Sequence, residues 1–377
     1  MTTPAVAAGS GRRVGWLELF FDLVFVVVIQ RLTDLLHDDP GALDFAAVAV
    51  LAVFVWACWI NVTLLTNVAG GVGARSRPLV FLSMAGVALI AVAIPGVTDD
   101  TGWLFAVGYA VARTAVWPLW VRSRDVVART WWGPTVFGPG LGALWVASIA
   151  VPEPARWAVW AALVAVEIAF LVRGLPTAPH DAMHMIERVG LFVMIVLGES
   201  VVVLILAVDT RRLAVELPVA LLAFAVICCF WWIYFDLGTR AEGVFERDET
   251  GRVFRDVLVF DHFFYVVALV GVAAGLGAAI EHAGEPRLPH GSVVAVAGGA
   301  AVFYLAQVAT AVRYGERVRF AVVWASPSLA LSALLLVLGP AFAPWAVVAV
   351  VLAGALVHVV SGDFFWRRRG RYLMSGR

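Results

Sequence analysis

Long apolar blocks recur along the whole chain and are almost free of charged residues. Examples are residues 45–65, 189–208 and 217–235, and short polar stretches separate one block from the next. A helix needs about 20 apolar residues to cross the hydrocarbon core of a bilayer, and this chain offers roughly twelve blocks of that kind. The pattern predicts an all-α fold, a polytopic bundle of transmembrane helices in contact with the lipid bilayer.

The composition excludes several classes of protein. Hydrophobic residues make up 62% of the 377 residues and charged residues 14%, against about 25% charged in an average soluble domain. The formal net charge is zero, so we expect no nucleic-acid partner. All 27 basic residues are arginine, which excludes a lysine Schiff base and a P-loop phosphate site. The three cysteines lie inside apolar blocks, so we expect no disulfide framework, zinc site or cofactor.

About twelve spans and two polar tails account for the chain. Residues 1–15 lack an apolar signal segment and are expected to form a disordered cytoplasmic tail. Two six-helix halves follow at 16–173 and 189–365, with a cytoplasmic connector at 174–188 and a basic cytoplasmic tail at 366–377. The predicted spans are residues 17–36, 43–66, 78–96, 102–121, 135–151, 156–173, 189–208, 217–237, 257–280, 291–312, 320–338 and 342–362.

The distribution of arginine predicts the orientation in the membrane. With these spans, four of the 27 arginines fall in one set of loops, two fall within spans, and the remaining 21 fall in the alternate loops and the tails. Positively charged loops stay on the cytoplasmic side. We therefore expect an even number of crossings, with both termini in the cytoplasm.

The two halves repeat several polar positions. Glu18 opens the first span and Glu187 the seventh, and Gln30 and Glu199 follow at the same distance in each half. The second span of each half carries a pair of tryptophans. Six spans per half predict parallel repeats, and transporters built this way place their site between the halves near the midplane.

Three charged residues are expected near the middle of the bilayer. They are Glu199 in the seventh span, Arg113 in the fourth and Glu167 in the sixth. A charge at that depth costs at least about 2.5 kcal/mol on insertion scales, so it is kept for function or paired structurally. We expect these groups to lie on a substrate or ion pathway, and a structural pair between Arg113 and a glutamate is the alternative.

A second set of polar residues is expected at the cytoplasmic ends of the spans. Acids in such a position can form a vestibule that concentrates cations. The alternative is ordinary helix-end chemistry, because acids favour helix N-termini. Glu18 and Asp22 are four residues apart and share one helix face. The set consists of Glu18, Asp22, Arg188, Asp236, Asp261 and His262.

A metal site is only weakly indicated. His180, His184 and Glu187 have the spacing of one helix face, but Pro179 next to His180 places the first histidine outside a helix. We therefore expect no metal.

Two spans carry polar stripes without charge. Asn61, Thr63, Thr66 and Asn67 mark the second span, and Gln307 and Thr310 mark the tenth. We interpret both stripes as interhelical hydrogen bonds that hold the bundle together.

Four motifs in this order resemble those of one membrane protein family. They are LELFFDLVFV at 17–26, HMIERVGL at 184–191 running on to LGES at 197–200, WWIYFD at 231–236, and Asp261-His262. With them the chain resembles the bacterial low-temperature-requirement A (LtrA) family. The resemblance implies a multi-pass protein of the bacterial inner membrane linked to growth in the cold, with no defined molecular activity. Its marked positions in this sequence are Glu18, Asp22, Arg188, Glu199 and Asp236.

Three functions are compatible with these residues. The first is a transporter or channel for a small solute or ion, which needs no catalytic residue. The second is an intramembrane enzyme acting on lipid-linked groups through His184, Glu187, Arg188, Asp261 and His262. The third is a non-catalytic scaffold in the cold stress response, in which the midplane charges are paired in a dry core. The intramembrane charges favour transport over catalysis.

Overall fold

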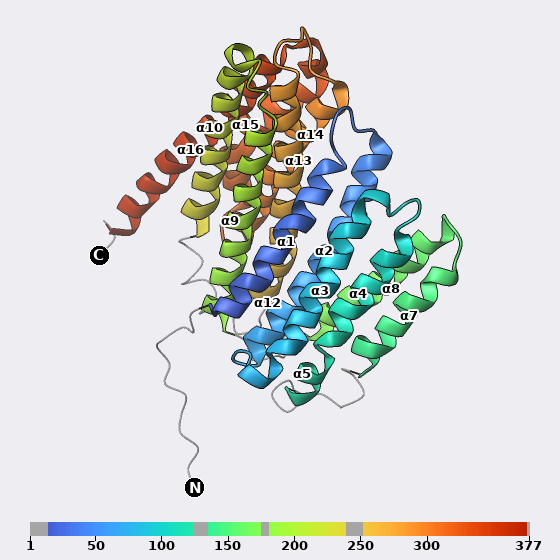
Figure 1. Ribbon diagram of the computed structural model, residues 1–377. Helices are drawn as coiled ribbons and strands as arrows, with labels where there is room; N and C mark the ends of the chain where they lie inside the picture. The colour runs from blue at the N-terminus through green and yellow to red at the C-terminus, as the bar shows by residue number, and fades with distance from the viewer. Residues whose placement is uncertain (1–13, 124–134, 175–180, 239–251, 375–377) are drawn as a thin grey trace.

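The computed structural model describes residues 14–123, 135–174, 181–238 and 252–374, and every regular element within them is a helix (Figure 1). The first part contains α1 (Trp16–Asp34), α2 (Ala42–Val68), η1 (Ala74–Ser76), α3 (Arg77–Ala93), η2 (Ile94–Gly96), α4 (Gly102–Ala115), α5 (Trp117–Arg122), η3 (Val136–Gly140), α7 (Leu141–Ala147), η4 (Ser148–Ala150) and α8 (Ala155–Gly174). The second contains α9 (Ala182–Leu206), α10 (Leu213–Gly238), α12 (Arg252–Arg255), η6 (Asp256–Asp261), α13 (His262–Glu281), α14 (His290–Arg313), α15 (Val318–Leu338), η7 (Gly339–Ala341) and α16 (Pro344–Met374). The predicted all-α fold is confirmed.

Nine helical segments of the described chain are long and apolar enough to cross a membrane. This finding establishes a multi-pass membrane protein, with fewer clear spans than the twelve expected. The nine are Ala42–Val68, Ala74–Gly96, Gly102–Arg122, Ala182–Leu206, Leu213–Phe235, Arg252–Glu281, His290–Arg313, Val318–Ala341 and Pro344–Gly362.

The other three predicted spans are also helical, but each departs from a simple apolar span. Helix α1 carries Glu18, Asp22, Arg31 and Asp34 within its 19 residues. The fifth predicted span is short, and its first turn is a π-helical turn that contains Pro139. Side chains of α8 are described only as far as residue 169. The count of twelve crossings therefore stays a prediction.

Helix α9 begins earlier than the sequence indicated. The side chain of Asp181 accepts a hydrogen bond from the backbone N–H of His184 at 3.0 Å and so caps the helix at Ala182. Residues 182–188, assigned to a connector by the hydropathy pattern, are thus helical. This start places Arg188 inside the bundle instead of in a loop, and it places Glu199 in the last third of the helix.

Glycines allow two helix pairs to pack with their backbones in contact. A Cβ atom on Gly86 of α3 would lie 2.5 Å from the backbone nitrogen of Ala112 on α4. A Cβ atom on Gly275 of α13 would lie 2.6 Å from the backbone nitrogen of Val296 on α14. Small residues at such crossings are the usual means of close helix packing in membranes, where burial of apolar surface drives little association.

The starts of α1 and α9 lie together with α5 and α12 at one end of the bundle (Figure 1). We call this end the terminal face, and the end that carries the connection between α13 and α14 the opposite face. Helices α1 and α9 run side by side in the same direction from the terminal face. Helix α13 packs against α9, α10, α14 and α1 and is the most deeply buried of the candidate spans.

Candidate functional site

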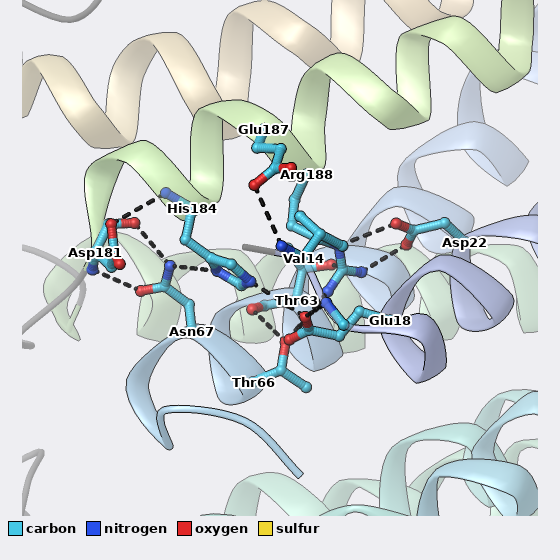
Figure 2. A network of polar contacts seen from close by, with 11 residues as sticks. Val14, Glu18, Asp22, Thr63, Thr66, Asn67, Asp181, His184, Glu187 and Arg188 are labelled. Atoms are coloured by element: carbon cyan, nitrogen blue, oxygen red, sulfur yellow. Dashed lines mark hydrogen bonds and ion pairs between the residues drawn. The ribbon is translucent and has the colours of Figure 1, made fainter. Parts of the chain in front are cut away.

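An ion pair joins α1 to α9 near the terminal face (Figure 2). Arg188 of α9 donates from Nη2 to Oδ1 of Asp22 at 2.5 Å and from Nε to Oδ2 at 3.0 Å. Both side chains are fully buried, with no exposed area. Trp59 of α2 donates its ring N–H to Oδ1 of the same aspartate at 2.8 Å. A bidentate pair with a third donor fixes the carboxylate in one geometry.

The same guanidinium group also binds two hydroxyl groups of α2. Nη2 donates to Oγ1 of Thr63 and Nη1 donates to Oγ1 of Thr66, each at 3.2 Å. A carboxylate oxygen of Glu18 lies 3.7 Å from Nη1. The guanidinium therefore draws α1, α2 and α9 together (Figure 2), and the predicted polar stripe of the second span supplies its threonines.

His184 extends this network in a defined tautomer. The amide of Asn67 accepts from the backbone N–H of Asp181 at 3.0 Å and donates to the backbone carbonyl of Asp181 at 2.8 Å, which fixes its orientation. Its N–H₂ group lies 3.1 Å from Nδ1 of His184, so Nδ1 accepts. The proton is then on Nε2, which donates to a carboxylate oxygen of Glu18 at 3.2 Å.

The two described residues of the weakly indicated metal site, His184 and Glu187, bind other partners. Both ring nitrogens of His184 are engaged, and Glu187 is exposed and accepts from the backbone N–H of Val14 at 3.2 Å. His180 lies outside the described residues. Within the described chain, the three side chains whose ligand atoms come close enough to hold an ion are His37, Asp38 and Glu281, at the opposite face.

A cavity of about 290 Å³ adjoins the network at the terminal face. It meets the network at Thr66, which also contacts Arg188. The loop after α2 forms part of its wall, where Gly70 and Gly71 have φ angles of 67° and 113° that favour glycine. The lining consists of Leu65, Thr66, Ala69, Gly71, Val72, Gly73, Ser76, Leu119, Arg122 and Ser123.

Four aromatic rings pack together next to the network, on its side away from the terminal face. The ring of Phe192 lies 4.5 Å from that of Trp59, 5.9 Å from that of Trp56 and 6.1 Å from that of Phe25, measured between centroids. Trp56 is held by a hydrogen bond from its ring N–H to the carbonyl of Val259 at 2.7 Å. We call these four rings the aromatic layer.

Glu199 lies on α9 beyond the aromatic layer, toward the opposite face. It follows Phe192 by seven positions, which corresponds to about 10 Å along a helix. The side chain is 5% exposed, and within the described residues its Oε1 atom has no hydrogen-bond partner. A buried carboxyl oxygen without a partner is costly, and such groups cluster at functional sites.

Arg113, the second charged residue predicted near the midplane, has a partner of its own in the first part of the chain. Arg113 lies on α4 and pairs with Glu167 of α8, with 3.2 Å between Nη2 and Oε2. Tyr109 donates its hydroxyl hydrogen to the same carboxylate oxygen at 2.9 Å. Arg113 and Glu167 are both buried among the helices of the first part of the chain. Their contact is the kind of ion pair that the alternative interpretation expected.

Asp261 and His262 form a separate cluster with α10 and α14. Asp261 accepts from the hydroxyl of Thr310 at 3.0 Å and from Nη1 of Arg313. Nδ1 of His262 lies 2.7 Å from the carbonyl oxygen of Val257, so Nδ1 carries the proton and donates. Nε2 then accepts a hydrogen bond from the hydroxyl of Tyr234 at 2.9 Å. The side chain of Asp236 lies outside the described residues. Within the described residues Glu18, Asp22 and Asp261 thus have specific partners, and the acidic vestibule stays a prediction.

The fold and these buried ionic contacts define a polytopic α-helical membrane protein. The chain belongs to the bacterial low temperature requirement A protein (LtrA) family, whose model matches residues 13–356. This match confirms the resemblance drawn from the motifs. An uncharacterized protein of Rhizobium meliloti is 26% identical over 283 residues, which cover 70% of this chain and 69% of that relative.

Proposed function

We propose that the protein is a transporter or channel for a small solute or ion, with its path along the seam between α1, α2 and α9. The observation that carries the proposal is the buried network of Asp22 and Arg188, which adjoins a cavity of about 290 Å³ through Thr66. Charged groups inside a membrane bundle are expensive and commonly mark solute or ion pathways.

The sequence of groups along α9 supports a path with two sides. The cavity and the network lie toward the terminal face, the aromatic layer lies next, and Glu199 lies beyond it. Such an order corresponds to a state closed at the aromatic layer, with a binding site open toward the terminal face. Movement of Phe192 away from Trp59 would join the network to Glu199.

The order of packing supports two parallel halves. In the first part α1 packs on α3, α3 on α4, α4 on α7, and α2 on α8. In the second part α9 packs on α13, α13 on α14, α14 on α15, and α10 on α16. The corresponding helices thus make corresponding contacts, and α1 meets α9 where the two halves join. A site at the interface of two repeats is the usual arrangement in transporters.

We place the terminal face in the cytoplasm of a bacterial inner membrane. The predicted loops of that face and the two tails hold most of the 27 arginines. Positive charge retained on the cytoplasmic side supports this orientation.

The two alternative functions have less support. The enzyme hypothesis needs His184 and Arg188 to meet Asp261 and His262, and these two pairs bond to different partners on different helices. The scaffold hypothesis accounts for the paired Arg113 and Glu167. It leaves the cavity and the unpartnered oxygen of Glu199 without a role.

The proposal is tested by flux measurements on protein reconstituted into proteoliposomes. A panel of monovalent ions, protons and small neutral and anionic solutes is applied to the native protein. We expect transport of at least one of them, and a loss of about tenfold or more in Glu199→Gln, equal to about 1.4 kcal/mol in barrier. Glu187→Gln is the matched control, because Glu187 is an exposed glutamate on the same helix.

Two outcomes would count against the proposal. Native protein that moves nothing in the panel would contradict transport. Flux that is equal in the native protein and in Glu199→Gln would remove Glu199 from the path.

A further inference from the structure

Three buried polar side chains in the second part of the chain have no hydrogen-bond partner for their functional groups. Tyr304, Gln307 and His358 are 1%, 0% and 1% exposed. Within the described residues, the hydroxyl of Tyr304, both polar atoms of Gln307 and both ring nitrogens of His358 lack a partner. Buried polar groups are nearly always hydrogen-bonded, so five such atoms on three residues need an explanation.

The three side chains come from two adjoining helices. The imidazole of His358 on α16 lies 4.8 Å from the ring of Tyr304 on α14 and 4.3 Å from the ring of Trp324 on α15, between centroids. Gln307 follows Tyr304 by three residues, so both lie on the same side of α14. The ring of Phe230 on α10 lies 6.0 Å from that of Tyr304. Aromatic rings therefore border the unpartnered groups.

Polar side chains of α14 follow from these groups to the terminal face and wind around the helix on the way. Thr310 follows Gln307 by three residues, accepts from the hydroxyl of Tyr265 at 3.1 Å and donates to Asp261 at 3.0 Å. Arg313 follows by three more, is 34% exposed and pairs with Asp261. These polar residues thus run from the partly exposed Arg313 to Tyr304, turn by about 180° around α14 on the way, and end at buried groups that have no partner within the described residues.

We infer that Tyr304, Gln307 and His358 form a binding site for water, and that it is the inner end of an inlet along α14 from the terminal face to His358. The amide, hydroxyl and neutral imidazole together offer both donors and acceptors. A cation would need acceptors and an anion would need donors, whereas water uses both. Chains of polar groups that contain histidine serve as proton relays in membrane proteins. The inlet is separate from the path along α1, α2 and α9.

The experiment is solid-state NMR of the full chain in lipid bilayers with ¹⁵N-labelled histidine. Magnetisation is transferred from water to the imidazole nitrogens, and deuterium exchange of the ring N–H is followed. His358→Phe identifies the His358 signal among the seven histidines. We expect rapid transfer to His358 and complete exchange in the native protein, with both lost in Gln307→Leu.

Two further variants keep the test decisive. Gln30→Leu is the matched control, since it makes the same change on α1 and should retain both signals. Tyr304→Phe removes one hydroxyl group, keeps the ring contact with His358, and should slow the transfer even where Gln307→Leu fails to fold. A His358 that receives no magnetisation from water in the native protein overturns the inference. Transfer and exchange that are unchanged in both Gln307→Leu and Tyr304→Phe also overturn it.

Discussion

Replacing Arg188 by methionine should destabilise the protein more than most single substitutions. The change removes two hydrogen bonds to Asp22 and one to each of two threonines. It leaves the Asp22 carboxylate buried at 0% exposure, with the ring N–H of Trp59 as its remaining hydrogen-bond donor within the described residues. Removing one member of a buried pair costs about 3–5 kcal/mol, and the geometry here places the loss in that range.

The double variant Asp22→Asn with Arg188→Met isolates the pair. Neutralising Asp22 removes the uncompensated charge, so the double variant should recover part of the loss. We expect an interaction energy of about 2–3 kcal/mol between the two positions. Stability is measured as the free energy of unfolding in mixed detergent micelles, with tryptophan fluorescence as the signal.

Glu187→Gln, one residue before Arg188 and exposed, is the control and should change the free energy of unfolding by less than about 0.5 kcal/mol. The explanation is refuted if Arg188→Met loses less than about 1 kcal/mol, because that is the range of exposed ion pairs. It is equally refuted if the two single losses add in the double variant.

Three further predictions concern packing and pairing. Arg113→Leu should destabilise by about 3–5 kcal/mol and Arg113→Leu with Glu167→Leu by much less, measured by the same unfolding assay; a double variant as unstable as the single one would contradict a structural pair. Gly86→Ala should lower the free energy of unfolding by about 1–3 kcal/mol because its Cβ would meet the backbone of α4, whereas Gly298→Ala, where nothing lies within 4 Å, should not; equal effects would show that α3 and α4 are not in backbone contact. Trp59→Phe should keep the ring packing and lose the bond to Asp22, at a cost of about 1.5–3 kcal/mol, and an unchanged free energy of unfolding would exclude that bond.

The helices were predictable because each depends on a local run of apolar residues. Every predicted span coincides with a helix or a run of consecutive helical turns. The predicted start of α9 was wrong, because Glu187 and Arg188 looked like the polar end of a loop. The cap by Asp181 and the burial of Arg188 against α1 and α2 are tertiary effects, and hydropathy does not register them.

Much of the candidate site could be named from the sequence, but its pairing could not. Glu18 and Asp22 were predicted on one helix face, and both lie near Arg188. The partners are 166 residues apart in the chain, so spacing gives no indication of the contact. Arg113, Glu167 and Glu199 were all predicted near the middle of the bilayer, so depth alone could not tell which glutamate pairs with Arg113, and in the structure it is Glu167. The cavity is formed by a turn and two helix ends, and no motif indicates it.

The glycine contacts between α3 and α4 and between α13 and α14 limit how the bundle can move. At Gly86 and at Gly275 there is no room for even a Cβ atom against the partner backbone, so sliding either pair would bring neighbouring side chains into that backbone. Each pair should therefore travel as a rigid unit during any conformational cycle. Relative movement in such a cycle would then occur between α1 and α9, because their contact is made by side chains that can exchange partners.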